Sequence, residues 1–156
     1  MLDGMAELPL RSGVRPMTSA SGQHRQLSQH SHPDLWGRVA AAVFSMDRVV
    51  EGHSSVCSPS VRAAFLEDAL VPRSAGTSLA PITARLEPVH LHDVVDTSLH
   101  LCLPADRAHE VCALGWGEPH YYTGHETEIM VYGPRDLDEL TSVIDIVLES
   151  VAFARG

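Results

Sequence analysis

The 156-residue chain contains no lysine and no asparagine, and its 11 basic residues are all arginines. They stand against 20 acidic residues, which gives a formal net charge of −9 and an isoelectric point near 5.4. Nucleic-acid-binding domains normally present a basic face, so this balance argues against a nucleic-acid partner. The chain also lacks an apolar run of the roughly 18–20 residues that a membrane-spanning helix needs. We therefore expect neither a nucleic-acid nor a membrane partner.

Cysteine is scarce, and several well-known motifs are missing. The three cysteines, Cys57, Cys102 and Cys112, are odd in number and none belongs to a CxxC pair. This pattern indicates reduced thiols in a cytoplasmic protein rather than a disulfide framework or a zinc knuckle. The sequence carries no secretory apolar segment, phosphate-binding loop, nucleophile elbow, or fingerprint for flavin or NAD binding.

The pattern along the chain predicts one α+β domain behind a polar N-terminal segment. Residues 1–30 are rich in Ser, Gly, Gln, Pro and Arg without helical or strand periodicity, so we expect a flexible tail there. Residues 31–156 are expected to form a single α+β domain with a small, mainly antiparallel sheet and helices packed on one face. The histidines of the tail, His24, His30 and His32, are then solvated bystanders.

Periodicity places most of the elements of this domain. Apolar residues at helical spacing predict a helix over 33–50, ended by Gly52, and two further helices over 105–114 and from Asp136 onward, where Asp136 and Glu139 form a capping box. Alternation predicts a hairpin of strands over 85–92 and 98–103 and another strand over 128–132. Residues 53–72 fit either a helix or two short strands, because periodicity does not decide between them over so few residues.

The chain has 10 histidines, and three of them lie on the predicted hairpin. Alternation points His90 and His92 to one side of their strand and His100 to one side of the returning strand, with leucines and valines opposite. If the register aligns these faces, three imidazoles meet on a rigid sheet. Three neutral histidines can hold a catalytic Zn, Fe or Cu ion, and they can equally supply a general base. A solvated outer face is the simpler alternative for such a pattern.

A second concentration of side chains follows the hairpin. His120 comes after a Gly-Trp-Gly turn, and aromatic residues gather around it at Trp116, Tyr122 and Tyr132. Such a group can line a ligand pocket, although it can also be a satellite of the core. Arg135, just ahead of the last helix, can bind an anionic ligand or clamp a neighbouring carboxylate.

Several of these segments together resemble one family. They are Glu87-Pro88-Val89-His90-Leu91-His92, Thr97-Ser98-Leu99-His100-Leu101, Gly115-Trp116-Gly117-Glu118-Pro119-His120 and Val131-Tyr132-Gly133-Pro134-Arg135. The chain resembles the small luciferase-domain family of bacteria and fungi over about residues 53–156. The resemblance implies oxygenase chemistry on a polyketide-derived pyrone without flavin, and it falls on His90, His92, His100, His120 and Arg135.

Two functions of different class follow. The first is a small-molecule enzyme of the oxidoreductase type, oxygenase-like, acting on a small hydrophobic or aromatic molecule. Its catalytic residues would be His90, His92, His100 and His120, with His90, His92 and His100 either as general base or as ligands of a divalent metal. Trp116, Tyr122, Tyr132 and Arg135 would bind the ligand. The second is a non-catalytic ligand- or metal-binding accessory domain, in monomeric or homodimeric form.

Overall fold

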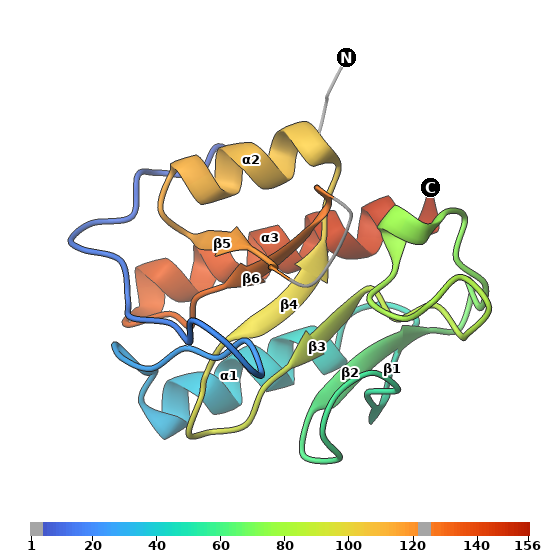
Figure 1. Cartoon of the computed structure of the whole chain (residues 1–156), viewed down its shortest axis with the longest axis horizontal. Coiled ribbons are helices and arrows are strands. Elements are labelled where there is room, and N and C mark those ends of the chain that lie inside the picture. Colours follow the sequence, from blue (N-terminus) through green and yellow to red (C-terminus); the bar gives the residue numbers. More distant parts are fainter. Residues whose placement is uncertain (1–4, 122–125) are drawn as a thin grey trace.

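The computed structural model describes residues 5–121 and 126–156, and a six-stranded antiparallel sheet forms its centre. The strand order is β1-β2-β3-β4-β6-β5, as Figure 1 shows. The strands are β1 (Val49–His53), β2 (Arg62–Leu66), β3 (Val89–Leu91), β4 (Leu99–Cys102), β5 (Gly117–Pro119) and β6 (Glu128–Val131). The helices are α1 (Pro33–Phe44), α2 (Ala105–Ala113) and α3 (Leu137–Arg155), with a short 3₁₀ turn at Ala75–Thr77.

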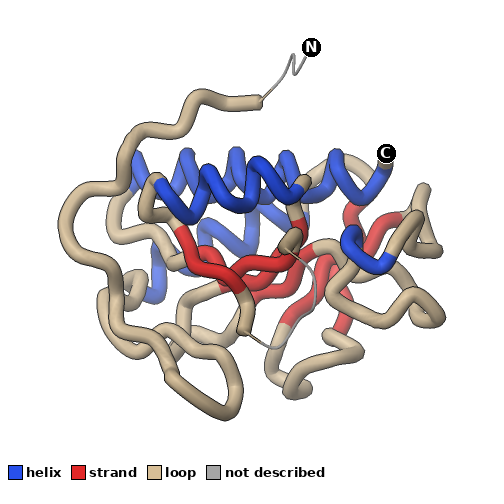
Figure 2. Tube along the Cα trace, turned by 45° about the horizontal axis from the view of Figure 1, so that its top comes forward, coloured by secondary structure: helices blue, strands red, loops and turns tan. Residues whose placement is uncertain are grey.

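The three helices contribute to one hydrophobic core on a single face of the sheet. Val39 of α1, Val111 of α2 and Val147 of α3 are fully buried and belong to the same cluster as Leu99 and Leu101 of β4. Figure 2 shows the helices gathered on one side of the strands, with long loops on the other. This arrangement confirms the predicted α+β fold. None of the helices in the described part is long and apolar enough to cross a membrane.

The predicted hairpin and the last two helices are confirmed. β3 and β4 pair antiparallel, with Val89 opposite Leu101 and His90 opposite His100. The side chain of Asp136 caps α3 by accepting a hydrogen bond from the Glu139 amide at 2.8 Å. Such a cap satisfies one of the amides that a helix start leaves without a partner, so the polar residue at this position fixes where the helix begins.

The first helix is shorter than predicted, and the undecided stretch 53–72 contains one whole strand, β2, and no helix. α1 ends at Phe44 instead of residue 50, because Arg48 turns the chain with a positive φ of 56° and the following valines enter β1. Val49 and Val50 then pair with Leu66 and Phe65 of β2. Their branched side chains suit a strand, and sheet pairing outweighs the helical spacing that they also satisfy.

The N-terminal segment packs on the domain, which differs from the flexible tail expected from its composition. Leu8 and Arg11 are buried, and the carbonyl of Pro9 accepts a hydrogen bond from the Trp116 indole at 2.8 Å. Further along, Gln26 is buried and its side-chain oxygen accepts from the Gly133 amide. In Figure 1 the segment runs down one edge of the sheet and then across its open face. Buried polar anchors hold it there, and composition does not reveal such anchors. The domain boundary at residue 31 stays a prediction.

Candidate functional site

The histidines of the hairpin lie on the sheet face that is turned away from the helices. One row of mutually opposed residues crosses this face from strand to strand. Its members, from β1 to β5, are Gly52, Ala63, His90, His100, Met130 and Glu118. The two imidazoles therefore occupy the centre of the sheet, and both side chains are buried. The expected meeting of His90 and His100 is confirmed, and the face is covered rather than solvated.

A carboxylate and two imidazoles form a buried hydrogen-bonded chain in this row. Glu87, which is 0% exposed, lies 2.9 Å from Nδ1 of His90, and Nε2 of His90 lies 3.1 Å from Nδ1 of His100. Ser54 and the Ser55 amide also donate to the Glu87 carboxylate. Burial lowers the pKa of His90 despite the attraction of Glu87. Burial together with the neighbouring histidines places the pKa of His100 well below its ordinary value. The chain thus ends on a neutral imidazole.

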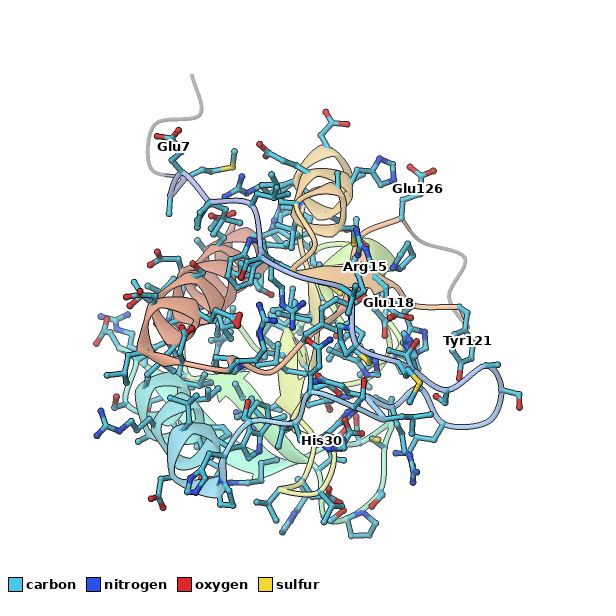
Figure 3. The ribbon with its side chains drawn as sticks, turned by 90° about the vertical axis from the view of Figure 1, so that its left-hand side faces the viewer. Glu7, Arg15, His30, Glu118, Tyr121 and Glu126 are labelled. Carbon is cyan, nitrogen blue, oxygen red and sulfur yellow. The ribbon has the colours of Figure 1, made fainter. Side chains whose placement is uncertain are left out.

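His24 completes the centre of the site from the N-terminal segment. Its ring stacks on that of His100 with centroids 5.3 Å apart, and its Nδ1 lies 3.4 Å from Nε2 of His100. Its other nitrogen, Nε2, lies 2.9 Å from the Glu118 carboxylate. Figure 3 looks onto the β5 edge of the sheet, where Arg15 of the N-terminal segment lies beside Glu118. Sequence reasoning missed His24 and assigned it to solvent, whereas only 1% of its surface is exposed.

His120, which follows β5, closes the group from the opposite side. Its ring centroid lies 4.6 Å from that of His100 and 5.2 Å from that of His24. Burial and the positive charge of the neighbouring histidines lower the pKa of His120 to about 4. Its Nε2 lies 3.9 Å from Glu128, and burial raises the pKa of that carboxyl to about 7. We use "histidine cluster" for His24, His90, His92, His100 and His120.

His92 belongs to the cluster but takes different partners. Its Nδ1 lies 2.9 Å from the Ser98 hydroxyl and 3.1 Å from the Asp96 carboxylate, while its buried Nε2 makes no hydrogen bond in the described part of the chain. A ring nitrogen of His92 lies within 4.8 Å of the Cys57 sulfur. Burial disfavours the charged ring, but Asp96 and the Cys57 sulfur outweigh it and raise the pKa of His92 to about 9. Burial would in turn raise the pKa of Cys57, yet His92 and a backbone hydrogen bond at Ser58 lower it.

Two cavities adjoin the cluster. The larger has a volume of about 540 Å³. Its walls include His24, His90, His100, His120, Cys57 and Glu128. The smaller, of about 340 Å³, is bordered by His92 and Asp96. Small-molecule sites typically measure about 300–1,000 Å³, so the larger cavity is suited to a compact aromatic molecule. Four of its wall residues are histidines, which is the most distinctive chemistry of this cavity.

Three of the four residues predicted to bind ligand lie away from the two cavities. Trp116 is a core residue on the helix side, and Tyr132 is buried with its hydroxyl donating to Glu118 at 3.0 Å. Arg135 forms an ion pair with Glu139 and donates to the Ser12 carbonyl. Tyr122 falls outside the described residues. Neither Trp116, Tyr132 nor Arg135 borders the two cavities. Tyr132 supports the site indirectly, through the carboxylate that holds His24.

The histidines that the hairpin pattern predicts as one set of metal ligands fall into two different groups. Within residues 5–121 and 126–156, His90, His92 and His100 do not form one converging ligand group. Two other groups each bring their ligand atoms within 4.8 Å of one another: His24 with His100 and His120, and Cys57 with His90 and His92. The hydrogen bonds explain the split, because His90 already uses Nδ1 toward Glu87 and Nε2 toward His100.

Comparison with known proteins agrees with the resemblance noted in the sequence. Residues 85–150 match the family model described as "Luciferase domain". The chain is similar to the luciferases of Armillaria gallica and Armillaria mellea, with 28% and 29% identity over 94% of this chain. The chain is therefore similar to the luciferase-domain family over residues 85–150. Similarity to the luciferase of Neonothopanus nambi is 28% over 96% of the chain.

The chain spans about 60% of the length of the curated relatives that it matches. No solved structure matches it significantly. The matched family region contains β3, β4, α2, β5, β6 and most of α3, and therefore His90, His92, His100 and His120. His24 and Cys57 lie outside that region, although the alignments with the fungal luciferases cover most of the chain.

Proposed function

We propose that this protein is a small-molecule enzyme that oxygenates a small hydrophobic or aromatic compound without a flavin. The observation that carries the proposal is the single cavity of about 540 Å³ with His24, His90, His100 and His120 in its walls. These side chains come from the N-terminal segment, β3, β4 and the residues after β5. Converging histidines beside a cavity of this size are typical of catalytic sites. The name of the fungal relatives, luciferase, supports an enzyme.

The geometry is suited to removing a proton from a bound substrate. An imidazole in the cavity wall can take a proton from an acidic carbon, and the buried chain from Glu87 through His90 holds the ring of His100 in a fixed orientation. The resulting carbanion can give its electron pair to dioxygen, which forms a carbon–oxygen bond and a peroxide anion. The proton taken by the imidazole then returns to the peroxide, so substrate and dioxygen together give a hydroperoxide.

Oxygen uptake with a panel of aryl-substituted 2-pyrones tests this proposal. We expect uptake with at least one pyrone, incorporation of oxygen-18 from labelled dioxygen into the product, and loss of both in His100→Gln. His109→Gln is the matched control, because the His109 side chain is 60% exposed on α2 and lies outside both cavities. Folding of both variants is compared by circular dichroism.

The same experiment separates the enzyme from a non-catalytic binding domain. One outcome is that calorimetry detects binding of a pyrone, that His100→Gln weakens this binding, and that no oxygen is taken up. This outcome would support a ligand-binding accessory function and contradict the oxygenase. Equal oxygen uptake by wild type and His100→Gln would place the chemistry outside the histidine cluster.

A further inference from the structure

We propose that His24, His100 and His120 bind a divalent transition-metal ion, Zn²⁺ or Fe²⁺, at the wall of the larger cavity. This ligand set differs from the one expected from the hairpin alone, since it includes a residue from the N-terminal segment and leaves out His90 and His92. Imidazole nitrogen is a preferred ligand of these ions, and three histidines with a further open position are typical of catalytic zinc sites.

The distances between the ligand atoms fit one ion. A ring nitrogen from each of the three histidines lies within 4.8 Å of those from the other two. Nδ1 of His24 and Nε2 of His100 are 3.4 Å apart. Two nitrogens that bind a tetrahedral zinc at roughly 2.0–2.1 Å are separated by about 3.4 Å. The pair is therefore already spaced as two ligands of one ion, and a ring nitrogen of His120 lies within 4.8 Å of both.

The remaining nitrogens of two of these rings are held in the way that metal-binding histidines usually are. Nε2 of His24 contacts Glu118 at 2.9 Å, which leaves Nδ1 directed at His100. Nδ1 of His100 contacts His90 at 3.1 Å, and His90 in turn contacts Glu87. A carboxylate on the outer nitrogen fixes the tautomer and the orientation of a ligating imidazole. Glu118 and Glu87 thus orient the ring nitrogens that would bind the ion.

The other candidate group is less suited to an ion. It consists of Cys57, His90 and His92, but both ring nitrogens of His90 already have partners in Glu87 and His100. Binding an ion there would break the buried chain that orients His100. His90 is therefore a positioning residue for the proposed site rather than a ligand in it.

The surroundings of the proposed site offer charge balance and access. Glu118 contacts His24, Glu128 lies 3.9 Å from Nε2 of His120, and Glu87 stands behind His90. These carboxylates balance the positive charge that an ion brings to a buried position. All three proposed ligands border the cavity of about 540 Å³. A small molecule in that cavity can therefore reach an open coordination position.

Titration of the purified full chain, without a histidine tag and after treatment with a chelator, tests the site. We expect one equivalent of Zn²⁺ to bind in a calorimeter, and one equivalent of Co²⁺ to give the visible absorption of a low-coordinate nitrogen site. His24→Gln and His120→Gln should abolish both signals. Glu118→Gln, which keeps the side-chain shape, should weaken Zn²⁺ binding by roughly 10–100-fold.

A control variant and a folding measurement accompany these titrations. His109→Gln should bind like the wild type, and circular dichroism shows whether each variant is folded. If a histidine variant does not fold, Glu118→Gln and the Co²⁺ spectrum of the wild type still decide. Binding that survives His24→Gln but is lost in His92→Gln would overturn this ligand set in favour of the other group, and no binding by the folded wild type would overturn the site. Nε2 of His100 can bind an ion or take a substrate proton, but not both at once. A negative result here therefore leaves the oxygen-uptake proposal standing, with His100 free to act as the base.

Discussion

His92 and His100 are neighbours on one sheet face, with ring centroids 4.7 Å apart. Their surroundings nevertheless favour a charged ring at His92 and a neutral ring at His100. His100 hydrogen-bonds to two other imidazoles, and burial with the adjacent histidines lowers its pKa. His92 is also buried, but Asp96 and Cys57 raise its pKa to about 9. Burial alone therefore does not decide the charge of a histidine. The balance between burial and the charged partners does. At His92, Asp96 and Cys57 together outweigh burial, whereas burial prevails at His90 and His100, and this divides one cluster into a neutral side and a charged side.

Glu87→Leu should have the largest effect, because it removes the carboxylate that anchors the neutral side. Glu87 accepts hydrogen bonds from Ser54 and Ser55 and contacts His90. Leaving several buried polar groups without a partner costs about 1–3 kcal/mol for each group, so we expect the free energy of unfolding to fall by about 3 kcal/mol or more. Urea denaturation measures it. Glu67→Leu, at an exposed position, should change it by less than about 0.5 kcal/mol.

The charge on His92 should make the free energy of unfolding depend on pH. The pKa of His92 is about 9 in the folded protein and has an ordinary value of 6.5. Its stabilising contribution is therefore complete below pH 6.5 and is lost as the pH rises toward 9. Wild type should exceed Asp96→Asn in unfolding free energy by on the order of 2 kcal/mol at pH 6, and by much less at pH 9.5. Denaturation curves at both pH values test this, and a gap that does not change with pH would contradict it.

Cys57 should react as a thiolate at a lower pH than an ordinary cysteine. His92 and the backbone at Ser58 lower its pKa, whereas burial raises the pKa of Cys112 to about 11. Iodoacetamide at pH 7, followed by peptide mass spectrometry, should label Cys57 first, with Cys112 as the internal control. Each unit by which Asp96→Asn raises the pKa of Cys57 should slow labelling by up to about tenfold. Equal labelling of the two cysteines would contradict a lowered pKa of Cys57 and therefore a charged His92 beside it.

Arg135→Ala should have the smallest effect, because this residue lies outside both sides of the cluster. Its partners are Glu139 and Ser12, and its side chain is 30% exposed. A partly exposed ion pair contributes about 0–1 kcal/mol, so we expect a loss of stability in that range and unchanged Zn²⁺ affinity. A large loss of affinity would show that the family motif around Arg135 contributes to the site in a way that these contacts do not.

Part of the fold and site could be predicted because it rests on local patterns. Alternation along residues 89–91 and 99–102 places His90 opposite His100, and the capping side chain of Asp136 marks the start of α3. His24 could not be predicted in this way. It reaches His100 from 76 residues away through anchors such as Gln26 and Arg11, which have no periodic signature. Trp116 was misassigned for a related reason, since the same aromatic residue suits a core and a pocket.

The separation of His92 from His100 was also beyond the sequence. Strand alternation correctly places both on one side, but the turn after β3 brings Asp96 and Ser98 to Nδ1 of His92. Hydrogen-bond partners of this kind depend on turn geometry, which the spacing of residues does not determine. The sequence therefore identifies which imidazoles meet, while the structure is needed to identify which of them can share an ion.

The contact between His24 and His100 also closes a loop of 76 residues. Closing such a long loop lowers the entropy of the chain, and this loss occurs when the N-terminal segment docks, before any ion binds. An ion held across this contact would act as a reversible cross-link, and it would stabilise the docked segment in proportion to the logarithm of the free-ion concentration. Metal availability would then set how firmly the N-terminal segment is held on the sheet face. A chain that begins at residue 31 would lack His24 and therefore this coupling.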